Sequence, residues 1–148
     1  MVKIKQDQFD ELDAKQLLMV LNAFKKGDFS HRLPNNLVGI QGKVADTLNS
    51  IIDKAQDTVI EFERVAKLAG REGKVGERIE LPEMKGSWAK LVDVSNALAN
   101  DLISPMNEMI RIVGAVADGD LSQKMAMEID GFKLKGQFLK SAEIVNTM

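Results

Sequence analysis

Apolar residues recur at helical spacing along most of the chain. In residues 14–24 they step by 3, 4 and 3 positions, residues 106–116 repeat those steps, and residues 44–55 step by 4, 3 and 4. Such spacing gives one apolar stripe per helix and is typical of the a/d seam of a coiled coil. The longest strongly apolar run, residues 17–21, is far shorter than the roughly 20 residues that span a bilayer.

Between the helical stretches, a short motif occurs three times. The heptapeptide Gly27–Leu33 returns as Gly119–Met125, 92 residues later, and a degenerate copy, Gly73–Ile79, lies midway. Each copy has Gly first, an apolar residue third, a basic residue sixth and an apolar residue seventh. Repetition at a fixed period predicts an array of one structural unit. We place the repeats at residues 13–57, 58–103 and 104–148 and name them repeats 1, 2 and 3; we expect the second helix of repeat 3 to be truncated at its C-terminal end.

Each repeat continues in the same way beyond the heptapeptide. A glycine follows 12, 13 or 17 residues after the first glycine of the heptapeptide, and an asparagine follows ten residues after that. The glycine–asparagine pairs are Gly39 and Asn49, Gly86 and Asn96, and Gly136 and Asn146. Varying length indicates a loop, so each repeat reads as helix, connector, helix. Because an extended connector of about 12 residues can run back along a helix of about 16 residues, the two helices are expected to be parallel.

Two amphipathic helices cannot enclose a core alone, so a parallel homodimer that closes a four-helix bundle is expected. The fold class is therefore all-α, with stacked repeats and helices that continue between them; Ser104-Pro105 is interpreted as the start of a helix. The residues expected to form the bundle core are Leu17, Leu21, Phe24, Val44, Leu48, Ile51, Val59, Phe62, Ala66, Ala69, Leu91, Leu98, Met109, Val113 and Val116. The residues expected to anchor the connectors are Gly27, Phe29, Leu33, Gly73, Val75, Ile79, Gly119, Leu121 and Met125.

These motifs resemble the HAMP domain, the relay module of histidine kinases and chemoreceptors. The resemblance rests on Pro105 followed by Gly119–Ser122 and Asn146–Met148, and on the helix start Gly39–Asn49, where Gly39-Ile40 replaces the usual acidic pair. The whole most resembles the tandem HAMP arrays of soluble bacterial hybrid histidine kinases, over roughly residues 13–148. The resemblance implies three stacked units, each a parallel homodimeric four-helix coiled coil that carries conformational signals without catalysis.

Repeat 2 departs from the other two by one residue. The positions equivalent to the seam of repeat 3 are Ile60, Glu63, Lys67 and Gly70, which cannot all line a core. One residue further towards the N-terminus lies a good seam of small and aromatic residues, Val59, Phe62, Ala66 and Ala69. We expect the shift to be absorbed by altered rotation or packing, and hypothesise that repeats 1 and 3 share one packing mode while repeat 2 adopts another.

Composition narrows the possible chemistry. The chain has no cysteine and a net charge of −2, which excludes thiol chemistry and gives no electrostatic reason for nucleic-acid binding. The single histidine, His31, is interpreted as a structural surface residue, and the carboxylate pairs as solvated faces. Residues 70–76 are glycine-rich but lack the ending of a phosphate loop. Trp88 is expected where connector and bundle meet, with a partner surface as the alternative. No cofactor or metal is expected.

The expected function is a signal relay, by helix rotation or repacking, to an output domain of a sensor kinase or receptor. The alternatives are a non-switching coiled-coil scaffold, an enzyme and a monomeric bundle. No group of residues supports the enzyme. The partners expected are a second copy of the chain and adjacent domains of a longer protein, with neither nucleic acid nor membrane insertion. No signal-peptide pattern precedes residue 8, so the expected location is the cytoplasm.

Overall fold

The computed structural model describes residues 12–148; the start of the chain, on which the expectation about a signal peptide rests, lies outside the described residues. The chain divides into two compact parts, one that ends at Arg64 and one that spans Val65–Met148. The protein is mostly helical, as predicted. Each part has its own small core and is described by itself.

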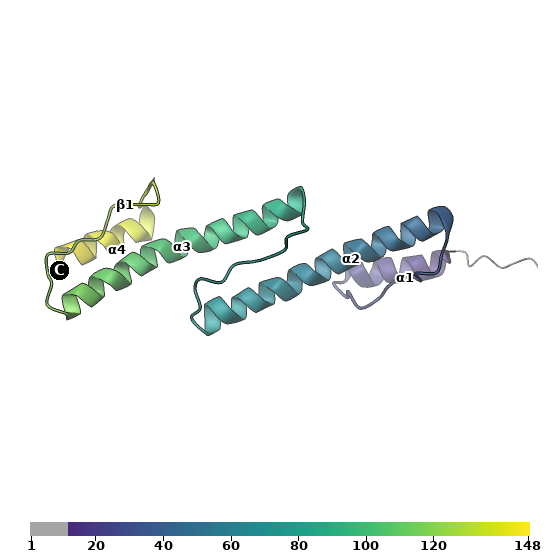
Figure 1. Ribbon diagram of the computed structural model, residues 1–148, viewed down its shortest axis with the longest axis horizontal. Coiled ribbons are helices and arrows are strands. Elements are labelled where there is room, and N and C mark those ends of the chain that lie inside the picture. The colour runs from purple at the N-terminus through teal and green to yellow at the C-terminus, as the bar shows by residue number, and fades with distance from the viewer. Residues whose placement is uncertain (1–11) are drawn as a thin grey trace, which may run out of the picture. The chain divides into compact units, whose positions relative to one another are not determined.

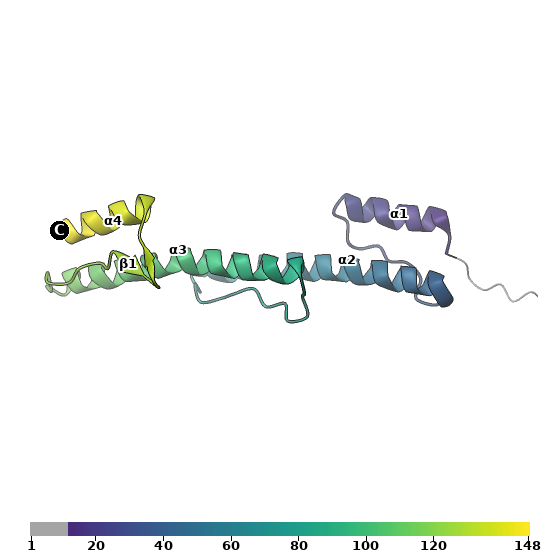
Figure 2. The same ribbon diagram turned by 90° about the horizontal axis from the view of Figure 1, so that it is seen from above.

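The first part pairs two helices, α1 (Ala14–Lys25) and α2 (Gly39–Val65). The side chain of Asp13 accepts a hydrogen bond of 2.9 Å from the N–H of Lys15 and so caps α1. The connector returns along α1, so both helices run in the same direction, which confirms the parallel prediction for this pair (Figures 1 and 2). The buried cluster draws on both helices and the connector, and consists of Val20, Leu33, Ala45 and Ile52.

The π-helical turn η1 (Ala66–Arg71) lies near the start of the second part, and a connector of residues 72–86 leads from it to the long helix α3 (Ser87–Ala117). A second connector then leads to α4 (Gly136–Thr147), which lies along the second half of α3 in the same direction (Figures 1 and 2). The buried cluster of this part consists of Ile112, Met125 and Ala142. Like the first cluster, it contains residues from both helices and the seventh residue of the connector between them.

The all-α prediction needs one correction, because the last connector contains a small hairpin. Strands β1 (Glu128–Ile129) and β2 (Phe132–Lys133) pair antiparallel, with Glu128 opposite Lys133. Asp130 and Gly131 form the turn with φ values of 51° and 81°, the combination that a two-residue type I′ turn requires. The hairpin accommodates the greater length of this connector compared with that of repeat 1.

The predicted helix start at Ser104-Pro105 is wrong, because α3 runs through Pro105 without interruption. Proline has no N–H, so the carbonyl of Asp101 loses its helical donor, at a cost of about 3 kcal/mol in an isolated helix. Pro105 is buried, and neither glycine nor a second proline breaks residues 87–104. Burial and continuous helical propensity therefore prevail over the proline.

The helix end before the connector differs in repeat 2. In repeats 1 and 3, the N–H after the first connector glycine binds the carbonyl five residues back: Asp28 to Ala23 and Asp120 to Ala115, both at 2.9 Å. In repeat 2, Lys74 binds Leu68, six residues back, also at 2.9 Å. The one-residue shift found in the sequence therefore coincides with a change in the backbone hydrogen bonding at η1. The different packing mode expected for repeat 2 stays a prediction.

Candidate functional site: the connector clamps

The most regular feature of the chain is a pair of hydrogen bonds that holds each connector against the helix that follows it. An asparagine side chain accepts from the N–H, and donates to the C=O, of the seventh connector residue. We call this arrangement the connector clamp. The pairs and distances are Asn49 with Leu33, 2.8 and 2.9 Å; Asn96 with Ile79, 2.9 and 3.0 Å; and Asn146 with Met125, 2.6 and 3.1 Å.

The clamp works because the side-chain amide matches an extended backbone. Asn carries an acceptor and a donor on one planar group, so it can satisfy both polar groups of one residue, as a neighbouring strand would. The clamped residue is buried in every repeat: Leu33 is 3 % exposed, Ile79 7 % and Met125 2 %. Because buried backbone groups need partners, the clamp lets each connector bury an apolar side chain without leaving its own N–H and C=O unsatisfied.

A basic residue next to the clamped one adds a second attachment in repeats 1 and 2. The guanidinium of Arg32 donates to Asp53 at 2.9 Å and to Gln56 at 2.8 Å, both on α2, and also to the carbonyl of Phe29. Arg78 likewise donates to the side chain of Asn100 on α3, at 2.9 Å. Each arginine therefore folds its connector over the following helix. Lys124 holds the same place in repeat 3, but its compact ammonium lacks the planar fork of donors with which a guanidinium binds several acceptors at once.

The third connector residue behaves differently in repeats 1 and 3. The ring of Phe29 packs on that of Phe24, with centroids 5.3 Å apart. Leu121 is 71 % exposed in the single chain, and its role as a connector anchor stays a prediction for the bundle. The helical partner of Phe29 is a phenylalanine, whereas the equivalent residue in repeat 3 is Val116, which offers no ring to cover Leu121. Val75 in repeat 2 is half-buried.

The first connector residues share a local geometry. Gly27, Gly73 and Gly119 have φ values of 82°, 70° and 87°, the left-handed conformation that ends a helix most easily at glycine. After Gly27, the Asp28 carboxylate accepts from the hydroxyl of Ser30 at 2.6 Å and from its N–H at 3.0 Å. These bonds, in that order, lower the pKa of Asp28, and His31, 3.3 Å away, adds a smaller effect. The geometry supports a structural role for His31.

Repeat 3 reproduces this cap. Asp120 accepts from the hydroxyl and N–H of Ser122, at 2.6 and 3.0 Å, and from Gln123 at 3.0 Å. The hydroxyl of Ser122 contributes most to lowering the pKa of Asp120, followed by the Gln123 amide. A turn stabilised by a short side chain of this kind needs no distant partner. The cap therefore shapes the connector start, and the clamp fixes its far end.

Residues 83–148 match the HAMP domain family. This segment is a HAMP domain. It contains the whole of α3, the hairpin and α4, and thus the Asn146 clamp. HAMP domains typically relay signals in receptors and kinases, and typically act as dimers. No solved structure matches the chain.

The residues predicted to form the bundle core are all at least partly exposed in the single chain, including those of the HAMP domain. The more exposed group, 41 % to 59 %, comprises Leu21, Val44, Ile51, Val59, Leu91, Leu98 and Val113, and Ala66 is also exposed. The half-buried group comprises Leu17, Phe24, Leu48, Phe62, Ala69, Met109 and Val116. Burial of these residues in a bundle with a second chain stays a prediction.

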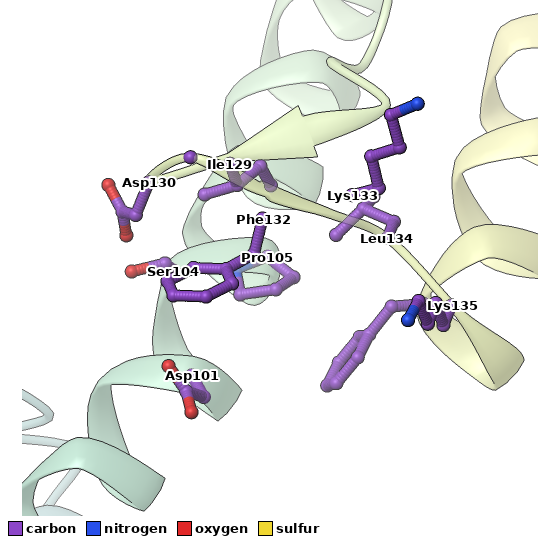
Figure 3. A pocket seen from close by; sticks show the side chains of 11 residues that line it. Asp101, Ser104, Pro105, Ile129, Asp130, Phe132, Lys133, Leu134 and Lys135 are labelled. Atoms are coloured by element: carbon purple, nitrogen blue, oxygen red, sulfur yellow. The ribbon is translucent and has the colours of Figure 1, made fainter.

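A cavity of about 570 Å³ opens between α3, the hairpin and the start of α4 of the HAMP domain. Its floor is apolar: Figure 3 shows the ring of Phe132 next to Pro105, below Ile129. The same figure shows acidic side chains on one side of the cavity, from Asp101 and Asp130, and the basic residues 133 and 135 on the other. No group of three potential metal ligands occurs among the residues that the structure describes.

Sequence reasoning did not single out the clamp asparagines as candidate site residues, although it found their spacing. The constant distance of ten residues from glycine to asparagine in three connectors of different length was the available clue. Trp88, the second residue of α3, does lie where a connector meets a helix, as expected. Within residues 12–148, no helix is both long and apolar enough to cross a membrane.

Proposed function

We propose that the chain is an array of three HAMP units that relays conformational change along a parallel homodimer towards an output domain of a sensor kinase or receptor. Repeats 1 and 2 would be HAMP units like the matched segment, and the chain itself would carry no catalytic activity. The single observation that carries the proposal is the connector clamp, which recurs with the same atoms and nearly the same distances in all three repeats.

The clamp supports a relay because it attaches each connector, which leaves the first helix, firmly to the second helix. The connector leaves one helix through a positive-φ glycine, buries its seventh residue, and is bound by two hydrogen bonds to the next helix. Each bond of this kind contributes about 1 kcal/mol. A rotation or shift of the first helix is therefore transmitted to the second through a short, well-attached segment, which is what a mechanical relay requires.

The exposed seam supports a dimer. Large apolar side chains on α3, including Leu91, Leu98 and Val113, are 44 % to 59 % exposed at helical spacing. An uninterrupted apolar stripe of this length indicates a protein–protein contact. A second copy of the same helices, running parallel, would cover it with knobs-into-holes packing. A scaffold without switching would share this dimer, so the dimer alone does not separate the two functions.

The dimer is tested by sedimentation equilibrium of the chain over a wide concentration range. The wild type is expected to have twice the mass of the chain. Ile51→Asp places a charge on the seam and is expected to shift the mass to that of a monomer, whereas Ser50→Asp, on an adjacent exposed position of α2, is expected to leave it unchanged. A helical wild type that stays monomeric at high concentration would refute the dimeric relay.

Switching is tested by comparing two variants of the relay with the wild type. In a longer protein that joins this array to a kinase, Asn96→Ala should uncouple kinase activity from its input while the dimer persists. A scaffold predicts that neither the basal activity nor its response changes. Asn100→Ala is the matched control on the same helix, because it removes the contact with Arg78 and leaves the clamp of repeat 2 in place. The response of this control to the input should be retained.

A further inference from the structure

The π-helical turn of repeat 2 contains one residue more than the equivalent turns of repeats 1 and 3. The bond that closes each helix fixes the alignment: the acceptors are Ala23, Leu68 and Ala115. The extra residue lies between acceptor and donor, where repeat 2 has residues 69–73 and the other repeats have only residues 24–27 and 116–119. Arg71, Lys25 and Ala117 are exposed residues of these three segments. Before the turn, repeat 2 therefore aligns with repeat 1 at a spacing of 45 residues (68 − 23), and after it at 46 (74 − 28).

We propose that η1 is a phase adaptor, which takes up this extra residue so that the apolar seam of repeat 2 keeps the same orientation towards its connector as the seam of repeat 1. The inference rests on the proposed array and adds how its middle unit stays in phase. A π turn holds one residue more than an α turn. One residue rotates an α-helix by about 100°, so a regular α-helix at this point would turn the seam away from the connector.

The 45-residue alignment selects the apolar seam of repeat 2. It maps Leu17 onto Phe62 and Leu21 onto Ala66, whereas a shift by one further residue would map them onto Glu63 and Lys67. Charged side chains are expensive to bury without partners, and both Glu63 and Lys67 are exposed in the structure. The position of the extra residue in the hydrogen bonding and the position of the apolar seam in the sequence are independent observations, and they agree.

The local environment permits an irregular turn. No residue of η1 is buried within the single chain, so packing inside the chain does not impose a helical phase on the turn. Gly70 lies in the turn, and a Cβ added there would meet open space. Gly73 then ends the turn at φ 70°, as Gly27 and Gly119 do in the other repeats. The connector beyond it forms the usual clamp between Asn96 and Ile79, so the adaptor leaves the following segment unchanged.

Three matched deletions test the adaptor in the whole chain: Arg71, Lys25 and Ala117 are each removed in turn, and thermal unfolding is followed by circular dichroism. Removal of Arg71 shortens the segment between Leu68 and Lys74 to the length found in repeats 1 and 3, so it should convert η1 to an α turn and leave Tm unchanged or raised. Removal of Lys25 or Ala117, where no extra residue exists, should lower Tm by about 5 °C or more. Equal losses in all three variants, or no loss in any, would overturn the proposal.

A second measurement uses the fact that the chain has no cysteine. Single-cysteine variants Phe62→Cys and Glu63→Cys are oxidised, and the rate of disulfide formation between two chains is compared, with Leu48→Cys as the control for the dimer. Disulfides need Cα atoms about 4.4–6.8 Å apart, so faster reaction at position 62 supports the adaptor and faster reaction at 63 overturns it. No reaction at position 48 would refute the dimer, and the deletions would then decide on the adaptor.

Discussion

The connectors of repeats 1 and 3 begin and end alike and differ in between. Both start with a positive-φ glycine and an Asp–Ser cap, and both end in a clamp on a buried apolar residue. Repeat 1 joins these ends through Phe29, which packs on Phe24. Repeat 3 leaves Leu121 in solvent and places its additional residues in a hairpin beyond the clamp.

The difference shows which parts of the connector geometry are fixed. Length varies only after the clamped residue, since the heptapeptide has the same number of residues in both repeats. The third residue varies in its packing because its helical partner varies. The two fixed points are thus the cap and the clamp, and the variants below test whether they are equally important in both repeats.

The largest effect is expected at the clamped residues themselves. Leu33→Ala and Met125→Ala each empty a site that is almost completely buried. Cavity formation of this kind lowers the free energy of unfolding by about 2–5 kcal/mol. Denaturant unfolding should show similar losses in both variants, with Leu121→Ala as a control in the same connector. A loss of less than about 1 kcal/mol at Met125 would mean that the connector of repeat 3 is not anchored there.

The clamp asparagines come next. Asn49→Ala and Asn146→Ala remove both hydrogen bonds and leave a backbone N–H and C=O without their partner, which should cost about 2 kcal/mol in the free energy of unfolding. In Asn49→Asp the carboxylate can still accept from the Leu33 N–H, but its second oxygen faces the Leu33 C=O in place of the amide donor, so the loss should be at least as large. If the aspartate variant unfolds at the same denaturant concentration as the wild type, the donation to the C=O is not what stabilises the connector.

The third connector residues should separate the two repeats. Phe29→Ala removes a ring that contacts Phe24 and should cost about 1–3 kcal/mol. Leu121→Ala should change the free energy of unfolding by less than about 0.5 kcal/mol, because surface substitutions have small effects. Both are measured by urea unfolding in the same buffer. An equal cost at Leu121 would place a partner surface over it and erase the difference between the repeats.

The hairpin turn offers a variant that acts only in repeat 3. Gly131→Ala forces a residue with a Cβ to adopt φ 81°, which should cost about 1 kcal/mol. Because no atom lies within 4 Å of the added Cβ, the cost is conformational. Gly76→Ala, where φ is ordinary and the space also open, is the control and should be neutral. Equal unfolding midpoints for the two variants would contradict a turn of this type.

The smallest effect concerns the caps and is best seen by NMR titration of the carboxyl groups. The pKa values of Asp28 and Asp120 are both lowered, mainly by the serine hydroxyls. Their stabilisation is therefore present above the unfolded-state pKa of about 3.9 and is lost as the pH falls through the folded-state values. Ser30→Ala should raise the pKa of Asp28 towards its ordinary value. Ser122→Ala should raise that of Asp120 less, since Gln123 still donates; a reversed order would contradict this assignment.

Sequence reasoning found the parallel pairing of α1 with α2 and of α3 with α4, and the burial of Leu33, Ile79 and Met125, because these follow from spacing and from chain length. It missed the hairpin, since two-residue strands leave almost no pattern of alternation. It also placed a helix start at Pro105, because local preference for proline at the first turn cannot reveal that the site is buried. The one-residue shift of repeat 2 was visible in the seam, but the place where the backbone takes it up was not.

The clamp has a consequence for how such a chain can change over time. Asn49, Asn96 and Asn146 bind the peptide groups of residues that differ in their side chains, Leu33, Ile79 and Met125. Because the contact involves only backbone groups, it does not restrict the side chain, and any apolar residue that fills the site can be substituted at that position. The buried side chain of each repeat can therefore change during evolution, and with it the stability of that repeat. The asparagine clamp itself stays the same in all three repeats.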